Sequence, residues 1–143
     1  METKITIVYD NCLNERGLKT GWGFSALIEI NHTSPILFDT GDDGVALLYN
    51  MEQLGIAPER IGTIVISHAH GDHTGIGAIL DAASSHGKIY GIIGGLHSFR
   101  DFSRLDVLSL ICPCHCTQYK DELERRFSEQ VVECGAGLEL VLS

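Results

Sequence analysis

Basic side chains are scarce in this chain. It contains 10 Lys and Arg against 19 Asp and Glu, which gives a formal net charge of −9 at pH 7. Phosphate backbones and anionic membrane surfaces are bound by clusters of Lys and Arg. The charge balance therefore disfavours nucleic acid and membrane surfaces as partners.

Long apolar segments and a paired set of cysteines are missing too. No stretch of the 143 residues has the length of a membrane span or the pattern of a secretion signal. The five cysteines are an odd number, and without a secretion signal they argue against a disulfide framework. We therefore expect a cytoplasmic protein.

The remaining composition is that of a globular protein. Hydrophobic residues make up 44% of the chain and charged residues 20%, and the sequence has no internal repeat, low-complexity tract or linker. A length of 143 residues suits one domain of ordinary size. We expect residues 1–143 to form a single domain.

The hydrophobic pattern predicts strands that alternate with helices. Alternating or continuous apolar runs predict strands, and apolar residues at three- and four-residue spacing predict helices. The expected strands cover residues 4–9, 24–30, 36–38, 61–66, 88–93 and 107–112, with two short ones near 130–132 and 138–142. The expected helices lie around residues 47–54, 75–85 and 118–128. This order is typical of an α/β sandwich with helices outside.

Three histidines and an aspartate fall within six residues, directly after a strand predicted to be buried. They are His68, His70, Asp72 and His73. In an extended segment, His68 and His70 project to the same side with Cα atoms roughly 6.5 Å apart, so two imidazoles can converge on one metal ion. Gly71 allows a sharp turn that brings the aspartate and the third histidine back toward the same cavity. The pattern favours a site for one or two metal ions.

Two alternative interpretations of this cluster are open. The histidines could lie in a polar surface loop without a metal, or they could form a closed structural zinc site. Four liganding groups so close together after a buried strand favour a metal over a plain surface loop. Structural zinc sites are usually rich in cysteine, whereas nitrogen and oxygen ligands leave room for a water molecule. We therefore favour an open, reactive site.

Residues 68–73 read His-Ala-His-Gly-Asp-His, which resembles the HxHxDH motif of the metallo-β-lactamase superfamily. Five other segments resemble one branch of that superfamily, the proteins similar to the dihydropterin ribofuranosyl-aminobenzene phosphate synthase of methanopterin biosynthesis. These segments are Tyr9–Asn11, Gly23–Ser25, Leu37–Gly41, Gly94–His97 and Pro113–Thr117. The resemblance covers nearly all of the chain, and it implies an αββα metallo-β-lactamase-like sandwich.

The resemblance also implies a role for each liganding residue. His68 and His70 would hold a first metal ion, and Asp72 and His73 would hold a second. His115, at the end of a late strand, would complete the second site. Zinc is the expected metal, and His and Asp ligands also suit iron or manganese.

Two further residues have less direct roles in the resemblance. His97 would be a bridging or additional metal ligand, and together with Asp72 it would take part in catalysis. His97 could instead bind substrate or cap the sheet. Asp39 would stand behind the ligands and orient a ligand histidine, a role that fits its place at a strand end.

Cys112, Cys114 and Cys116 surround His115, and two interpretations of them are open. Strand alternation would point the three thiols to one face and His115 to the other. The cysteines would then pack behind the site as small hydrophobic residues, which is the interpretation we favour. Alternatively, they form a separate thiolate metal site or a redox centre, although no CxxC pair supports it.

Compared with its branch, the chain is shortened in the middle. After Gly75 the segment that usually carries another histidine of the first metal site is missing, and that segment usually forms part of the pocket. Trp22 and Phe24 would either wall the remaining pocket or pack in the core. The shortening also exposes apolar surface, and a symmetric homodimer is the commonest way to bury it.

Metal-dependent hydrolysis is the expected function. A metal-bound hydroxide would attack a small-molecule substrate, namely a small ester, lactone or phosphoester. The resemblance offers a metal-dependent transferase of pterin biosynthesis as the alternative. A metal-binding protein without catalysis is a third possibility, because the fold hosts many chemistries.

The purified protein should contain zinc, iron or manganese. Chelation should lower its melting temperature, because a metal that binds only the folded state stabilises that state. Elemental analysis should show less metal in His68→Ala and Asp72→Ala, whereas His32→Ala in a predicted turn should keep the wild-type content. Equal losses in all three variants would mean that the cluster does not hold the metal.

Overall fold

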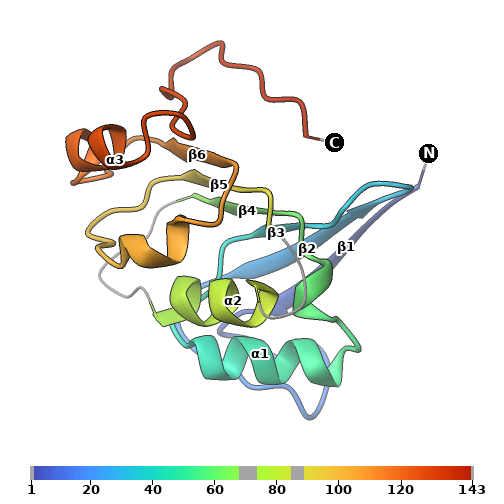
Figure 1. The fold of residues 1–143 in the computed structure, drawn as a ribbon. Helices are drawn as coiled ribbons and strands as arrows, with labels where there is room; N and C mark the ends of the chain where they lie inside the picture. The colour runs from blue at the N-terminus through green and yellow to red at the C-terminus, as the bar shows by residue number, and fades with distance from the viewer. Residues whose placement is uncertain (1, 68–73, 85–88, 143) are drawn as a thin grey trace.

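The computed structural model of the chain describes residues 2–67, 74–84 and 89–142. Within them, six strands form one sheet in the order β1-β2-β3-β4-β5-β6 (Figure 1). The strands are β1 (Thr3–Tyr9), β2 (Ser25–Ile30), β3 (Ile36–Phe38), β4 (Thr63–Ile66), β5 (Gly91–Gly94) and β6 (Leu110–Pro113). The helices of these residues are α1 (Gly44–Gln53), α2 (Thr74–Ser84) and α3 (Lys120–Arg126), with short 3-10 helices η1 (Pro58–Arg60) and η2 (Phe102–Leu105).

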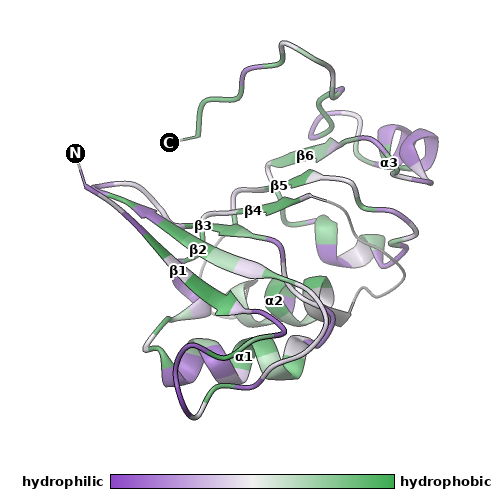
Figure 2. Cartoon of the chain, turned by 180° about the vertical axis from the view of Figure 1, so that it is seen from behind, coloured by the Kyte–Doolittle hydropathy of each residue, from purple (hydrophilic) through white to green (hydrophobic). Residues whose placement is uncertain are grey.

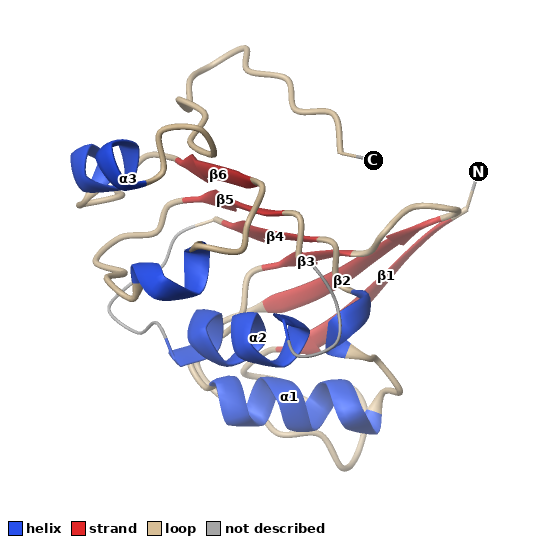
Figure 3. Cartoon of the chain, viewed as in Figure 1, coloured by secondary structure: helices blue, strands red, loops and turns tan. Residues whose placement is uncertain are grey.

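The expected mixed α/β class is confirmed. Each predicted helix and each predicted strand before residue 113 is present, with bounds shifted by a few residues (Figure 3). The strands are largely apolar, whereas the short helix α3 is largely hydrophilic (Figure 2). Within the described ranges, no helix combines the length and the apolar character that crossing a bilayer requires.

The sheet changes direction once along its strand order. β1, β2 and β3 pair antiparallel, and β3, β4, β5 and β6 pair in parallel. Parallel neighbours need crossover connections, which here contain α1, α2 and η2. As a result, the carboxyl ends of β3 to β6 all lie at the same edge of the sheet. We call this the carboxyl edge.

Local sequence sets both ends of α1. The Asp43 carboxylate accepts hydrogen bonds from the backbone N–H groups of Val45 and Ala46, at 2.9 and 3.1 Å, and so caps the first turn. The helix is followed by Gly55 with a φ of 68°, a left-handed conformation that glycine adopts without a Cβ clash. Gly55 therefore ends the helix.

The core lies between the sheet and the pair α1 and α2, which cover the same face (Figure 1). Leu37, Ile64 and Ile92 are register partners across β3, β4 and β5, so their side chains share that face. All three are fully buried, as are Leu47 of α1 and Ile79 of α2. Burying side chains of this size contributes roughly 1.5–3 kcal/mol each.

The other face of the sheet is apolar as well. Ile5, Ile28 and Ile36 are register partners on it, and Ile7 follows two residues after Ile5. Ile5 remains 61% exposed and Ile7 48%, whereas Ile28 and Ile36 are half-buried. The αββα sandwich expected from the sequence has two sheets that cover each other. The described residues form one β layer, and its second face keeps accessible apolar side chains.

The predicted strand at 138–142 is wrong. Those residues form no strand in the described chain, and they run as a loop away from the sheet (Figure 3). Only an isolated parallel bridge between Ile111 and Val131 remains of the strand predicted near 130–132. An apolar run becomes a strand only where a neighbouring edge offers backbone groups to pair with, and residues 138–142 pair with no strand of the described chain.

We propose that the homodimer expected from the sequence buries the second sheet face. Ile5→Lys places a charge on that face and should shift the protein toward monomer in light scattering, because an unpaired charge is costly to bury. Val45→Lys is the matched control, since Val45 is 72% exposed on α1, away from this face. A wild-type protein that stays monomeric at high concentration would contradict the proposal.

Candidate metal centre

The carboxyl edge collects the candidate residues that the structure describes. Asp39 directly follows β3, and Ser67 directly follows β4. His97 lies in the loop after β5, and His115 lies in the loop after β6. Ligand sites in α/β sheets usually form at such an edge, because neighbouring loops converge there. The sheet thus brings together four positions that are far apart in the sequence.

Asp39 is held firmly at this edge. Its backbone N–H donates to the carbonyl of Val65 at 2.8 Å, and its own carbonyl accepts from Ser25 Oγ at 2.7 Å. Its φ of 57° is left-handed, a conformation that Asp tolerates better than most residues. The carboxylate accepts from the backbone N–H and the Oγ of Ser67, at 2.7 and 2.5 Å. Asp39 therefore fixes the residue immediately before the histidine motif.

The histidine motif itself lies outside the described residues. His68, His70, Asp72 and His73 all belong to the segment 68–73. Their metal-binding roles, and the catalytic role of Asp72, stay predictions. What the structure gives is the position of Ser67, from which this segment starts.

Hydrogen bonds connect the segment around His97 to the loop after β6. Its carbonyl accepts from the backbone N–H of Gln118 at 2.8 Å, and the N–H of neighbouring Leu96 donates to Thr117 Oγ1 at 3.1 Å. His97 has a left-handed φ of 46°, and its Nδ1 atom is buried. Backbone strain of this kind concentrates at functional sites. The imidazole is thus held in a defined place beside the edge.

The loops after β4, β5 and β6 touch one another at Gly95. A Cβ added at Gly95 would lie 2.5 Å from Cys116 Sγ and 3.6 Å from the carbonyl oxygens of His115 and Ser67. The backbone N–H of Cys114 also donates to the carbonyl of Gly94 at 2.8 Å. Close backbone approach of this kind requires glycine, which has no Cβ to clash. His115 is exposed on the adjoining loop.

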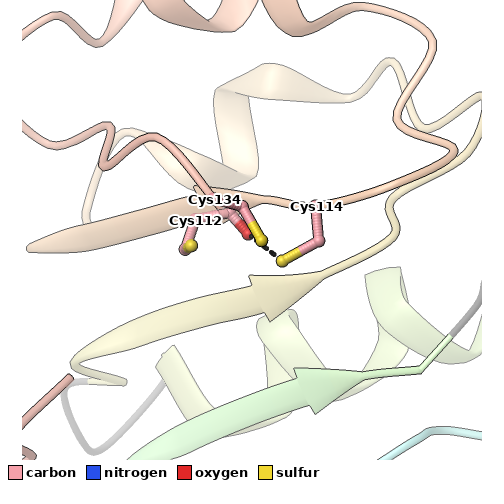
Figure 4. Close-up of side chains that lie close together, drawn as sticks. All are labelled: Cys112, Cys114 and Cys134. Carbon is pink, nitrogen blue, oxygen red and sulfur yellow. Dashed lines mark hydrogen bonds between the residues drawn. The ribbon is translucent and has the colours of Figure 1, made fainter. Parts of the chain in front are cut away.

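The cysteines group differently from the prediction. Cys112, Cys114 and Cys134 bring their sulfur atoms within 4.8 Å of one another (Figure 4). Cys116 does not share their face, because its left-handed φ of 59° breaks the strand alternation and its sulfur packs against Gly95 instead. Sequence reasoning missed Cys134. The predicted strand near 130–132 was the signal that could have placed it beside the strand that carries Cys112.

The thiols of this group are poor nucleophiles. Burial raises the pKa of Cys112, and it raises the pKa of Cys114 to about 12. The thiolate is the reactive form of cysteine, so without a bound cation both side chains stay protonated near neutral pH. This is consistent with the interpretation of Cys112, only 1% exposed, as a small hydrophobic residue.

An open cleft of about 960 Å³ lies beside the carboxyl edge, between the start of α1, α2 and the loop after β5. Its lining includes Asp42, Ser98 and Arg100. Asp42 also accepts a 2.5 Å hydrogen bond from the Tyr9 hydroxyl, and burial together with this carboxylate raises the pKa of Tyr9. A cleft of this size can admit a small-molecule substrate.

Trp22 does not pack in the core, which corrects one of the two interpretations given for it. Its side chain is 79% exposed, and Phe24 is 39% exposed. Between them, Gly23 lies against Gly41, where an added Cβ would approach the Gly41 Cα to 3.0 Å. The two aromatic residues therefore flank the loop that follows Asp39, and they are accessible from outside.

Comparison with known families identifies the class. A model of the metallo-β-lactamase superfamily matches residues 21–109, which is more than half of the chain. The chain therefore belongs to the metallo-β-lactamase superfamily.

Individual relatives resemble parts of the chain. It is 45% identical over 56 residues to the 7,8-dihydropterin-6-methyl-4-(beta-D-ribofuranosyl)-aminobenzene-5'-phosphate synthase of Methanocaldococcus jannaschii. That match spans 37% of this chain and 19% of the relative. A solved Thermotoga maritima protein described as a metallo-β-lactamase is 15% identical, with a TM-score of 0.47, over 99% of this chain and 63% of that one.

Asp39→Asn should lower the free energy of unfolding by about 1 kcal/mol. The substitution removes the charge of the group that accepts two hydrogen bonds from Ser67, and so weakens both. Asn tolerates the left-handed backbone, so the loss reports on the Ser67 contacts rather than on strain. Urea denaturation measures the change. Asp106→Asn is the control, since its pair with Arg126 is exposed and should contribute little. Equal effects of both substitutions would contradict the role given to Asp39.

Proposed function

We propose that the chain is a metal-dependent hydrolase that acts on a small ester, lactone or phosphoester in the cytoplasm. The observation that carries the proposal is the contact among the loops after β4, β5 and β6 at Gly95. This contact gathers Ser67, which precedes the histidine motif, and the loops of His97 and His115 at one edge of the sheet. Membership of the metallo-β-lactamase superfamily supports it.

The described side chains at this edge include donors of the kinds that metal ions bind. Two imidazoles, of His97 and His115, lie on adjoining loops, and the Nδ1 atom of His97 is buried. The Asp39 carboxylate lies at the same edge and accepts two hydrogen bonds from Ser67. Imidazole and carboxylate groups are ligands that suit zinc, with iron or manganese also compatible. In the proposal, His68, His70, Asp72 and His73 supply the remaining ligands.

Polarisation of a substrate oxygen and activation of water are what a bound metal ion supplies in such a site. The chain's own residues do the rest. Asp39 holds Ser67, the residue before the histidine motif, in a fixed position. His97 contributes an imidazole to the metal ligands or to the substrate. The cleft beside Asp42 and Ser98 offers room for the substrate to bind.

One observation favours a second function. The Methanocaldococcus jannaschii relative, named as a synthase of a dihydropterin-linked ribofuranosyl-aminobenzene phosphate, is 45% identical over 56 residues. A metal-dependent transferase in pterin biosynthesis is therefore the alternative proposal. The match covers 19% of that relative, so the similarity extends to a part of a larger enzyme.

A substrate panel of phosphoesters, lactones and thioesters tests the hydrolase. At least one class should be hydrolysed, chelation should abolish the activity, and added metal should restore it. His97→Ala should lower kcat/KM by about 10-fold or more, because a misplaced or missing ligand reduces transition-state stabilisation.

His32→Ala is the matched control for this experiment. His32 is exposed in the turn after β2, so its removal should leave kcat/KM unchanged. Activity with pterin precursors alone would replace the hydrolase by the transferase. A folded, metal-loaded protein that turns over no compound of either kind would overturn both and leave a binding protein.

A further inference from the structure

We propose that Cys112, Cys114 and Cys134 form a second metal site, separate from the histidine motif, for a thiophilic d10 cation such as Zn²⁺ or Cu⁺. The three sulfur atoms already lie within 4.8 Å of one another (Figure 4). They come from the end of β6, the loop that follows it and the C-terminal tail. The site therefore joins segments that are 20 residues apart in the sequence.

Backbone pairing brings the tail to this place. Ile111 donates its backbone N–H to the Gln130 carbonyl at 2.9 Å, and Val132 donates to the Ile111 carbonyl at 2.9 Å. These bonds form a parallel bridge between Ile111 and Val131. Two paired backbone segments of this kind lie roughly 4.8 Å apart. Cys114 lies three residues after Ile111, and Cys134 lies three residues after Val131. The parallel register therefore places Cys134 beside Cys114.

The alternation of side chains along a strand places the sulfur atom of Cys112 in the same group. Cys112 lies in β6 and Cys114 directly follows the strand, so these side chains, two residues apart, project to the same side. The Cys114 thiol donates to the Cys112 carbonyl at 3.4 Å, which keeps its sulfur over this side (Figure 4). The cluster thus follows from the parallel register of the tail and the two-residue period of the strand.

The spacing of the sulfur atoms suits a metal ion. Zinc binds thiolate sulfur at about 2.3 Å, which places tetrahedral sulfur ligands about 3.8 Å apart. The three sulfurs reach that separation by shifts of about 1 Å or less, well within the freedom of a cysteine side chain. Three thiolates without nitrogen or oxygen ligands select soft ions, zinc or copper(I), over magnesium or manganese.

Accessibility supports binding from solution. Cys112 is buried, whereas Cys114 and Cys134 are half-buried and leave an entry for the ion. On binding, each thiol releases its proton to the solvent and the sulfur donates an electron pair to the cation, so no oxidant or reductant is needed. The bound ion would fasten the tail to β6, which is an edge strand of the described sheet.

Cobalt titration of the fully reduced protein tests the proposal, with Co²⁺ as a coloured substitute for Zn²⁺. One equivalent should produce thiolate-to-cobalt charge-transfer absorption, which imidazole and carboxylate ligands do not give. Cys114→Ser and Cys134→Ser should each reduce this absorption several-fold. Cys12→Ser is the matched control, since Cys12 is exposed and outside the cluster, and it should keep the wild-type absorption.

Two further arms separate the possible outcomes. His68→Ala changes the histidine motif and not the cysteine cluster, so it should keep the charge-transfer absorption. The thiolate site can therefore be tested independently of the hydrolase proposal. Elemental analysis after equal exposure to Zn²⁺ and Cu⁺ under reducing conditions identifies the preferred ion. Hydrogen exchange of residues 131–142 should slow on metal binding in the wild type and not in Cys134→Ser.

Two results would overturn the proposal. One is a reduced wild-type protein, with all five thiols titratable after unfolding, that gives no charge-transfer absorption. The other is absorption that persists unchanged in Cys134→Ser. Cys112→Ser could fail to fold because Cys112 is only 1% exposed. Cys134 lies outside regular secondary structure, so its variant keeps the test decisive.

Discussion

The parallel register of β3, β4, β5 and β6 is the constraint on which the rest of this structure depends. It aligns Leu37, Ile64 and Ile92 into a buried row under α1 and α2, which provides the core. The same register ends four strands at one edge, so the loops that follow them must meet there. Core and candidate site are thus two consequences of one hydrogen-bonding pattern, and a shift of register would disturb both.

Small residues and one carboxylate shape the candidate site at that edge. Gly95 lets the loops after β4, β5 and β6 approach more closely than a side chain would allow. Asp39 then fixes the end of β4 by accepting two hydrogen bonds from Ser67. A metal site needs ligands held within a few tenths of an ångström, so such support from outside the ligand set matters as much as the ligands.

Much of this arrangement could be predicted from the sequence, because it depends on local pattern. The strand that ends at Ile66, the glycine stop of α1 and the placement of Asp39 at a strand end all follow from hydrophobic period and turn residues. The errors share one physical origin. The strand at 138–142 needed a partner edge, and the grouping of Cys134 with Cys112 needed a tertiary register, and neither is encoded within a short window of sequence.

The loop after β6 connects the two proposed metal sites, and this gives the cysteine cluster a consequence beyond the tail. Cys114 and His115 are adjacent, and Cys116 packs its sulfur against Gly95 at the carboxyl edge. A cation that holds Cys114 restrains the backbone of His115 as well, because neighbouring Cα atoms are only about 3.8 Å apart. From the sequence, we expect that the segment after Gly75 that usually forms part of the pocket is missing from this chain. In the proposed arrangement, the thiolate site supports the pocket in place of that segment. One metal ion then stabilises the loop that carries a predicted ligand for another.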